Sequence, residues 1–183
     1  MSESTQFIGE VLHEQLELMV GQKKKFLTRF KGYQKTETQI AALSSIPGIA
    51  EVRACIIAAV VLSPKRFPNK HKFWAYSCLV KHDSRSGGVS YGKKNVPGNR
   101  ILKSVFMGAA KTVLAGDGEF RKLYDTFREE GVDHAAATKN VARKIAAIAL
   151  ASMRKGTHYK ENYEINRKPK IVEINLKHSA ARI

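Results

Sequence analysis

The chain has 183 residues, and its 32 Lys and Arg outnumber 16 Asp and Glu, which gives a formal net charge of +16 and a pI near 10.0. An apolar fraction of 43% excludes wholesale disorder, and this length allows one domain with an appendage. No stretch approaches the roughly 20 uninterrupted apolar residues of a membrane span, and the N-terminus lacks both regions of a signal peptide. We therefore expect a cytoplasmic protein with no membrane partner.

The positive charge is concentrated in one segment. Residues 63–104 hold 10 Lys and Arg against one acid, a net +9, whereas residues 1–62 have a net +1 and residues 105–183 a net +6. Such an excess repels itself unless an anion lies against it, and nucleic acid is the usual partner. A solvated basic surface is the alternative. The excess coincides with a Gly-rich stretch, which favours nucleic acid.

Residues 6–31 are predicted to form one amphipathic helix. Apolar residues recur at steps of three, four or seven, acids fill the first turns and bases the last, and Gly32 ends the pattern. The apolar seam is either the face of a helix packed on its own domain or half of a coiled coil. We interpret residues 1–35 as a coiled-coil-like helix and as a candidate surface for a homo-oligomer.

Two short helices, at 36–44 and 50–62, are predicted on either side of Ile46-Pro47-Gly48-Ile49. This pattern is typical of a helix-hairpin-helix, in which a tight turn and the exposed amides of the next helix bind a phosphate without reading bases. The candidate DNA-binding residues of this motif are Pro47, Gly48, Ile49 and Arg53. A plain αα-hairpin with a Pro-Gly turn is the alternative.

The rest of the chain predicts further helices around a long loop. Helices are predicted at 69–79, 99–115, 119–130 and 134–155, the last capped by Asp133 and ended by Gly156. Residues 81–100 carry four glycines and no helical period, so they predict a loop of about 20 residues, and loops of that length are usually functional or disordered. A basic tail with one candidate strand at 171–176 is expected at 161–183.

The expected fold is therefore mainly α. It comprises an N-terminal coiled-coil-like helix, a helix-hairpin-helix, and a helical bundle with a long Gly-rich basic loop, the last two forming one domain at 36–160.

Three pieces of the chain, in this order, resemble one family. They are Ile46-Pro47-Gly48-Ile49, the stretch from Ser86-Gly87-Gly88 to Gly98-Asn99-Arg100-Ile101-Leu102-Lys103, and Val141-Ala142-Arg143-Lys144-Ile145. Together, over about residues 36–160, they are similar to the C-terminal transposase domain of the insertion-sequence 110/116 family, whose members are RNA-guided DNA recombinases. Each piece is weak alone, and the ordered set is specific.

The resemblance implies a division of labour. In the family, a RuvC-like nuclease domain with metal-binding acids precedes a coiled coil, and the C-terminal domain contributes a catalytic serine, which corresponds to Ser86 here. That serine is expected to attack a DNA phosphodiester and form a phosphoserine link. The 45 residues before the hairpin are too few for a RuvC-like domain, so we expect this chain to lack it. The resemblance thus implies Mg²⁺ in the missing domain, no cofactor in this chain, and DNA and a guide RNA as partners.

The chain departs from the family pattern at three places. The family's Gly-Leu-x-Pro before the loop reads Cys78-Leu79-Val80-Lys81, a basic pair before Gly-Asn reads Val96-Pro97, and the Arg after Leu is Lys103. The chain is therefore either a truncated copy or a separately encoded or excised part.

Ser86 has the local setting that a nucleophile acting on a polyanion needs. Two glycines follow it, which allows close backbone approach, and bases surround it in sequence. The candidate DNA-binding residues of this region are Arg85, Gly87, Lys93, Lys94, Asn99 and Arg100. Ser86 as a plain turn residue is the alternative, and Ser84 and Ser90 compete with it.

Two functions stay open. The first is the C-terminal part of a DNA transposase or recombinase, whose serine cleaves and transfers strands. The second is a non-catalytic DNA- or RNA-binding module that keeps the helix-hairpin-helix. Asp83, Asp117, Glu119 and Asp125 form no recognisable metal set, so we expect the isolated chain not to cleave DNA.

Overall fold

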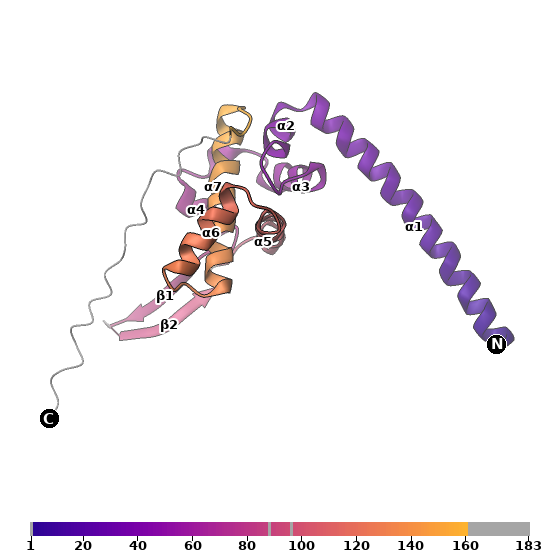
Figure 1. Cartoon of the computed structure of the whole chain (residues 1–183), viewed down its shortest axis with the longest axis horizontal. Coiled ribbons are helices and arrows are strands. Elements are labelled where there is room, and N and C mark those ends of the chain that lie inside the picture. The colour runs from indigo at the N-terminus through magenta and orange to yellow at the C-terminus, as the bar shows by residue number, and fades with distance from the viewer. Residues whose placement is uncertain (1, 88, 96, 161–183) are drawn as a thin grey trace.

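A computed structural model describes residues 2–87, 89–95 and 97–160, and the protein is mainly α, as predicted (Figure 1). The basic tail at 161–183, with its candidate strand at 171–176, lies outside the described residues. Within the described ranges, no helix is long and apolar enough to cross a membrane. In chain order the elements are α1 (Glu3–Thr36), α2 (Thr38–Ser44), α3 (Glu51–Val61), a short 3₁₀ helix η1 (Pro64–Arg66), α4 (Lys70–Tyr76), β1 (Lys81–Ser86), β2 (Val89–Asn95), α5 (Arg100–Leu114), α6 (Glu119–Glu129) and α7 (His134–Lys155).

Helix α1 extends away from the rest of the protein (Figure 1). Ser2 caps it by accepting a hydrogen bond from the Thr5 amide, and none of its residues is buried. It runs past Gly32, where an end was predicted, to Thr36. A glycine inside a helix costs only about 1 kcal/mol, so it does not stop a helix whose other residues favour it. α1 contacts α2 and α3, and its side chains Phe30 and Tyr33 lie against them.

The core surrounds α7, which contacts α2, α4, α5, α6 and η1. Its many alanines let neighbouring helices pack closely. Asp133 caps its start by accepting hydrogen bonds from two amides of the first turn, and Gly156 ends it with a left-handed φ of 64°, so both predicted boundaries are confirmed. The largest fully buried side chains include Phe73, Phe106, Leu43, Ile57, Leu102 and Ile145.

The prediction of a long loop at 81–100 is wrong, because most of this segment is an antiparallel β-hairpin. Lys81 pairs with Asn95 at the open end of the hairpin, and Ser86 pairs with Val89 at its tip. The turn begins at Gly87, whose φ is 57°. β1 contains no apolar residue, so the alternation of apolar and polar residues that marks a half-buried strand is missing. The Gly-Gly pair between two short runs is the sequence signal that favours a hairpin.

A β-bulge interrupts the hairpin near its middle. Between the pairs Asp83–Lys93 and Arg85–Ser90, two residues of β2 stand opposite Ser84 of β1. Gly92 is one of the two and has a φ of 87°, which other residues rarely adopt. The bulge increases the local twist of the hairpin, and it explains the third glycine of the Gly-rich stretch.

Candidate nucleic-acid interface

The tip of the hairpin carries the predicted nucleophile. Ser86 is the last residue of β1, directly before the turn at Gly87, and Arg85 precedes it. Figure 1 shows the hairpin projecting from the helical body, with its tip away from the helices. The structure therefore brings the predicted residues Arg85, Ser86 and Gly87 together at one projecting end.

His82 is the histidine nearest to Ser86 in sequence and the candidate for accepting its proton, but the two residues do not lie side by side. The two lie four positions apart on the same strand, which corresponds to about 13 Å along an extended chain. In the register of the hairpin His82 pairs with Lys94, and Asp83 pairs with Lys93. The predicted DNA-binding residues Lys93 and Lys94 thus lie nearer the open end of the hairpin than its tip.

Gly98 and Asn99 fix the open end of the hairpin to α4. A Cβ on Gly98 would lie 2.5 Å from the Tyr76 carbonyl oxygen and 2.9 Å from that of Ala75, so the position accepts only glycine without a shift. The Asn99 amide donates to the Tyr76 carbonyl oxygen at 2.7 Å. Its side-chain oxygen accepts from the Leu102 amide at 3.1 Å and caps α5. The Gly-Asn pair therefore sets where α5 starts relative to the hairpin.

The first turn of α5 contains basic residues, whereas the first turn of a helix usually favours acidic ones. Arg100 is its first residue and Lys103 lies in its first turn, both are exposed, and the first turn contains no acid. The N-terminus of a helix has a partial positive charge, so cations there are unfavourable by themselves and a bound anion is favourable. This end of α5 is suited to phosphate.

Helix α7 adds cations beside the hairpin that the sequence analysis did not assign to the site. Arg143 is half-buried, and its Nε donates to the Leu79 carbonyl oxygen at 2.8 Å, just before β1. Burial lowers the pKa of both Arg143 and Lys144, and the charge of Lys70 lowers that of Lys144 further, against an opposing effect of Glu119. The sequence signal for these residues is the adjacent pair Arg143 and Lys144 on a helix rich in alanine and other apolar residues.

The Pro47-Gly48 turn between α2 and α3 packs on α5. Gly48 has a φ of 80°, and a Cβ there would lie 2.6 Å from the Ala109 carbonyl oxygen. Arg53 donates to the Gly48 carbonyl oxygen at 2.6 Å and to Thr112 Oγ1 at 3.1 Å. Ile49 is 2% exposed and Pro47 is exposed. Gly48, Ile49 and Arg53 thus hold the turn in place, and DNA binding by this motif stays a prediction.

The predicted DNA-binding residues fall into two regions. Gly48 contacts α5 at Ala109, whereas Asn99 and Arg100 lie at the start of the same helix. Ten residues of α-helix correspond to about 15 Å. Any DNA contact at the turn is therefore separate from the one at the hairpin.

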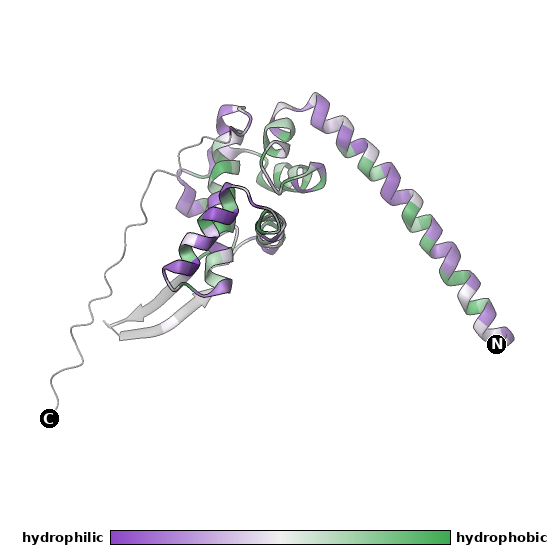
Figure 2. Cartoon of the chain, in the orientation of Figure 1, coloured by the Kyte–Doolittle hydropathy of each residue, from purple (hydrophilic) through white to green (hydrophobic). Residues whose placement is uncertain are grey.

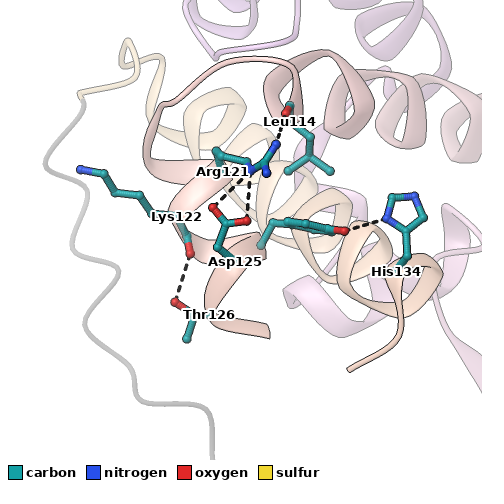
Figure 3. Close-up of polar contacts among 7 residues, drawn as sticks. Leu114, Arg121, Lys122, Asp125, Thr126 and His134 are labelled. Carbon is teal, nitrogen blue, oxygen red and sulfur yellow. Dashed lines mark hydrogen bonds and ion pairs between the residues drawn. The ribbon is translucent and has the colours of Figure 1, made fainter. Parts of the chain in front are cut away.

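The acids of α6 take part in structural contacts (Figure 3). Asp125 accepts two hydrogen bonds from Arg121 Nε, at 3.0 and 3.1 Å, and Arg121 also donates to the Leu114 carbonyl oxygen. Glu119 accepts from the Tyr159 hydroxyl at 3.1 Å. The described part of the chain contains no group of three or more His, Cys, Asp and Glu that is able to hold a metal ion. The Mg²⁺ that the resemblance implies belongs to the RuvC-like domain, and that expectation stays a prediction.

Trp74 is part of the packing between α4 and α7. Its Nε1 donates to the Arg143 carbonyl oxygen at 2.9 Å, and the ring packs against the core. Lys70 Nζ lies 5.5 Å from its ring centroid and His71 meets it edge-on. Trp74 thereby ties Arg143 to α4, next to the start of the hairpin.

A known family matches the segment that contains these features. Residues 40–125 match the family model of the IS116/IS110/IS902 transposases. The chain matches no curated protein. The matched segment begins in α2 and ends in α6, so it includes the Pro47-Gly48 turn, the hairpin and the start of α5. The resemblance drawn from the sequence is confirmed for these residues, and a transposase-related function is supported.

Proposed function

We propose that this chain is the DNA-binding part of a transposase and supplies the serine that cleaves and transfers DNA strands. The observation that carries the proposal is the family match at 40–125, because the matched segment contains both the basic hairpin and Ser86. The net +9 of residues 63–104 supports it independently. The proposed partners are DNA and a guide RNA, met in the cytoplasm.

DNA binding is proposed to run along the hairpin to the start of α5. A two-stranded ribbon is narrow enough to enter the major groove of B-DNA. Lys93 and Lys94 on β2 and Arg100 on α5 follow one another toward the body of the protein, and Arg85 and Gly87 lie at the tip. Cations spread along such a ribbon contact phosphates at successive positions and provide affinity without base specificity.

The binding test is a salt titration of duplex DNA with the full chain. Replacing Lys93, Lys94 and Arg100 together by alanine removes three cations, and each lost phosphate contact lowers the log–log salt slope by about 0.9. We expect weaker binding to all sequences and a slope reduced by about 2 to 3 in the triple variant. Unchanged affinity and slope would show that the basic charge is only a solvated surface.

The chemical step is proposed to begin at Ser86. Its hydroxyl oxygen bonds to a DNA phosphorus, the bond from phosphorus to one sugar oxygen breaks, and the departing oxygen takes up a proton in place of the one that the serine loses. His82 lies about four residues along the strand, roughly 13 Å away, so the proton acceptor is proposed to come from another part of the assembly. A RuvC-like unit would supply the metal ions that neutralise phosphate charge.

The chemical proposal is tested in an assembly with a RuvC-like unit and guide RNA. Ser86→Ala should bind DNA within a small factor of the unsubstituted chain and form no protein–DNA adduct on a denaturing gel. Ser84, at the bulge, and Ser90, opposite Arg85, provide matched controls, because their alanine variants should still form the adduct. An adduct that persists in Ser86→Ala refutes this assignment. An assembly that binds DNA but never forms an adduct points to the non-catalytic binding module.

Helix α1 is proposed to join two copies of the chain. Its apolar residues recur along a helix of 34 residues that has no buried residue (Figure 2). The exposed ones are Phe7, Ile8, Val11, Leu12, Leu16, Leu18, Met19, Val20 and Phe26. Pairing with a second α1 would remove this surface from water in the manner of a coiled coil.

A further inference from the structure

A group of four cations lies at the open end of the hairpin. Arg143 of α7 is held there by its bond to the Leu79 carbonyl oxygen, two residues before Lys81 starts β1. Lys139 precedes Arg143 by one turn of α7, so both lie on the same side of that helix. Lys103 comes from the first turn of α5, which packs against α7. Figure 1 shows the hairpin leaving the body beside the N-terminal part of α7.

Lys139 is within electrostatic reach of the other three cations. The pKa of the half-buried Lys139 is lowered first by burial and then by the charges of Arg143, Lys81 and Lys103. Asp133 alone is found to oppose this among the described residues, and its Oδ1 already accepts hydrogen bonds from the Ala135 and Ala136 amides. Like charges held together and partly removed from water destabilise the free protein.

None of these four cations forms an ion pair among the side chains that the structure describes. The two ion pairs found there join His13 to Glu17 and Arg121 to Asp125. Arg143 uses Nε for Leu79 and Nη1 for the Asn140 side chain, at 2.8 and 2.9 Å. Both bonds orient the guanidinium and leave Nη2 to donate to a ligand. Arg143 therefore provides an oriented guanidinium, and Lys81, Lys103 and Lys139 provide three ammonium groups in the same part of the fold.

We propose that Lys81, Lys103, Lys139 and Arg143 form a binding site for a backbone phosphate of the bound DNA. A phosphate accepts several charge-assisted hydrogen bonds at once, which suits a group of lysines around an arginine. The site rests on the proposed DNA-binding function and adds α7, which lies outside the matched segment, to the interface. A phosphate there would anchor the DNA at the open end of the hairpin while the tip reaches along it.

The test uses the full chain, labelled duplex DNA and anisotropy over a salt series of about 50 to 200 mM. Lys139→Gln removes one cation of the site, and Lys122→Gln is the matched control, since Lys122 is exposed on α6 and points away from its neighbours (Figure 3). We expect Lys139→Gln to weaken binding on the order of tenfold and to lower the slope by about 0.9. Lys122→Gln should stay within about twofold, and Lys139→Arg should retain binding.

A second measurement needs no variant. The pKa of Lys139, followed by the NMR shift of its Cε in the unsubstituted chain, should rise when DNA is bound, because a phosphate stabilises the ammonium. If Lys139→Gln does not fold, this NMR titration tests the phosphate site on its own.

The outcomes separate the two proposals. If the chain binds DNA, but Lys139→Gln behaves like Lys122→Gln or the Lys139 pKa does not change with DNA, the phosphate site is refuted and DNA binding stands. If the unsubstituted chain binds no duplex even at low salt, the DNA-binding function is refuted and the site with it.

Discussion

Replacing Gly98 by alanine tests how the hairpin is joined to the helical body. A Cβ at this position would lie 2.5 Å from the Tyr76 carbonyl oxygen, 2.9 Å from that of Ala75 and 2.9 Å from Cys78 Sγ. Two of these atoms belong to the backbone of α4 and cannot move aside as a flexible side chain does. The chain must therefore shift at the point where β2 leads into α5.

Two contributions lower the free energy of unfolding in Gly98→Ala. Overpacking against a rigid neighbour costs about 1 to 3 kcal/mol. A shift of residue 98 also disturbs the 2.7 Å hydrogen bond from the Asn99 amide to Tyr76, which contributes about 1 kcal/mol. We expect Gly98→Ala to lower the free energy of unfolding by about 3 kcal/mol, which corresponds to a Tm lower by roughly 6 to 12 °C.

The assay is urea unfolding followed by circular dichroism, with a thermal melt alongside. Gly116→Ala is the matched control, because Gly116 is exposed and a Cβ there meets nothing within 4 Å. It should change stability by less than about 0.5 kcal/mol. If Gly98→Ala unfolds within that margin of Gly116→Ala, the close approach at Gly98 does not exist and the reasoning about the hairpin base is refuted.

Three other variants test separate parts of the fold. Gly48→Ala should cost about 3 kcal/mol in urea unfolding, because the residue has a φ of 80° and a Cβ there would lie 2.6 Å from the Ala109 carbonyl oxygen; stability equal to that of the unsubstituted chain would contradict this. Asp133→Ala should cost about 1 kcal/mol in the same assay by removing the cap of α7, and an unchanged midpoint would argue against the cap. Leu12→Asp with Leu16→Asp should abolish self-association in sedimentation equilibrium and leave the melt of the body unchanged, since these side chains are 59% and 58% exposed; a dimer that survives would refute pairing through α1.

The helices were predictable because each carries local signals. α7 combines an Asp133 cap, apolar residues at helical spacing and Gly156 at its end, and the structure has those boundaries. α1 was predicted to end at Gly32 and does not, because a single exposed glycine lowers helix stability only modestly. Local chemistry therefore predicts where these helices lie better than where they end.

The hairpin and the cations of α7 were not predictable in the same way. β1 has no apolar residue, so its pairing with β2 depends on backbone hydrogen bonds and on turn geometry at Gly87, which leave little trace in composition. Lys139 and Arg143 lie 35 and 39 residues after the end of the basic segment 63–104, and only the packing of α7 beside Leu79 brings them to it. The charge of the sequence predicted a nucleic-acid partner, and the fold was needed to show that Arg143 lies beside the segment that precedes the hairpin.

The measurement that tests the central claim most directly is the chemical identification of the DNA-linked residue. The chain would be assembled with a RuvC-like unit, guide RNA and substrate DNA, the reaction stopped by denaturation, and the nucleotide-bearing peptide sequenced by mass spectrometry. The account predicts a phosphodiester on Ser86, at the tip of the hairpin. A link on Ser84, on Ser90 or on any other residue, or strand transfer without any protein–DNA link, would contradict it.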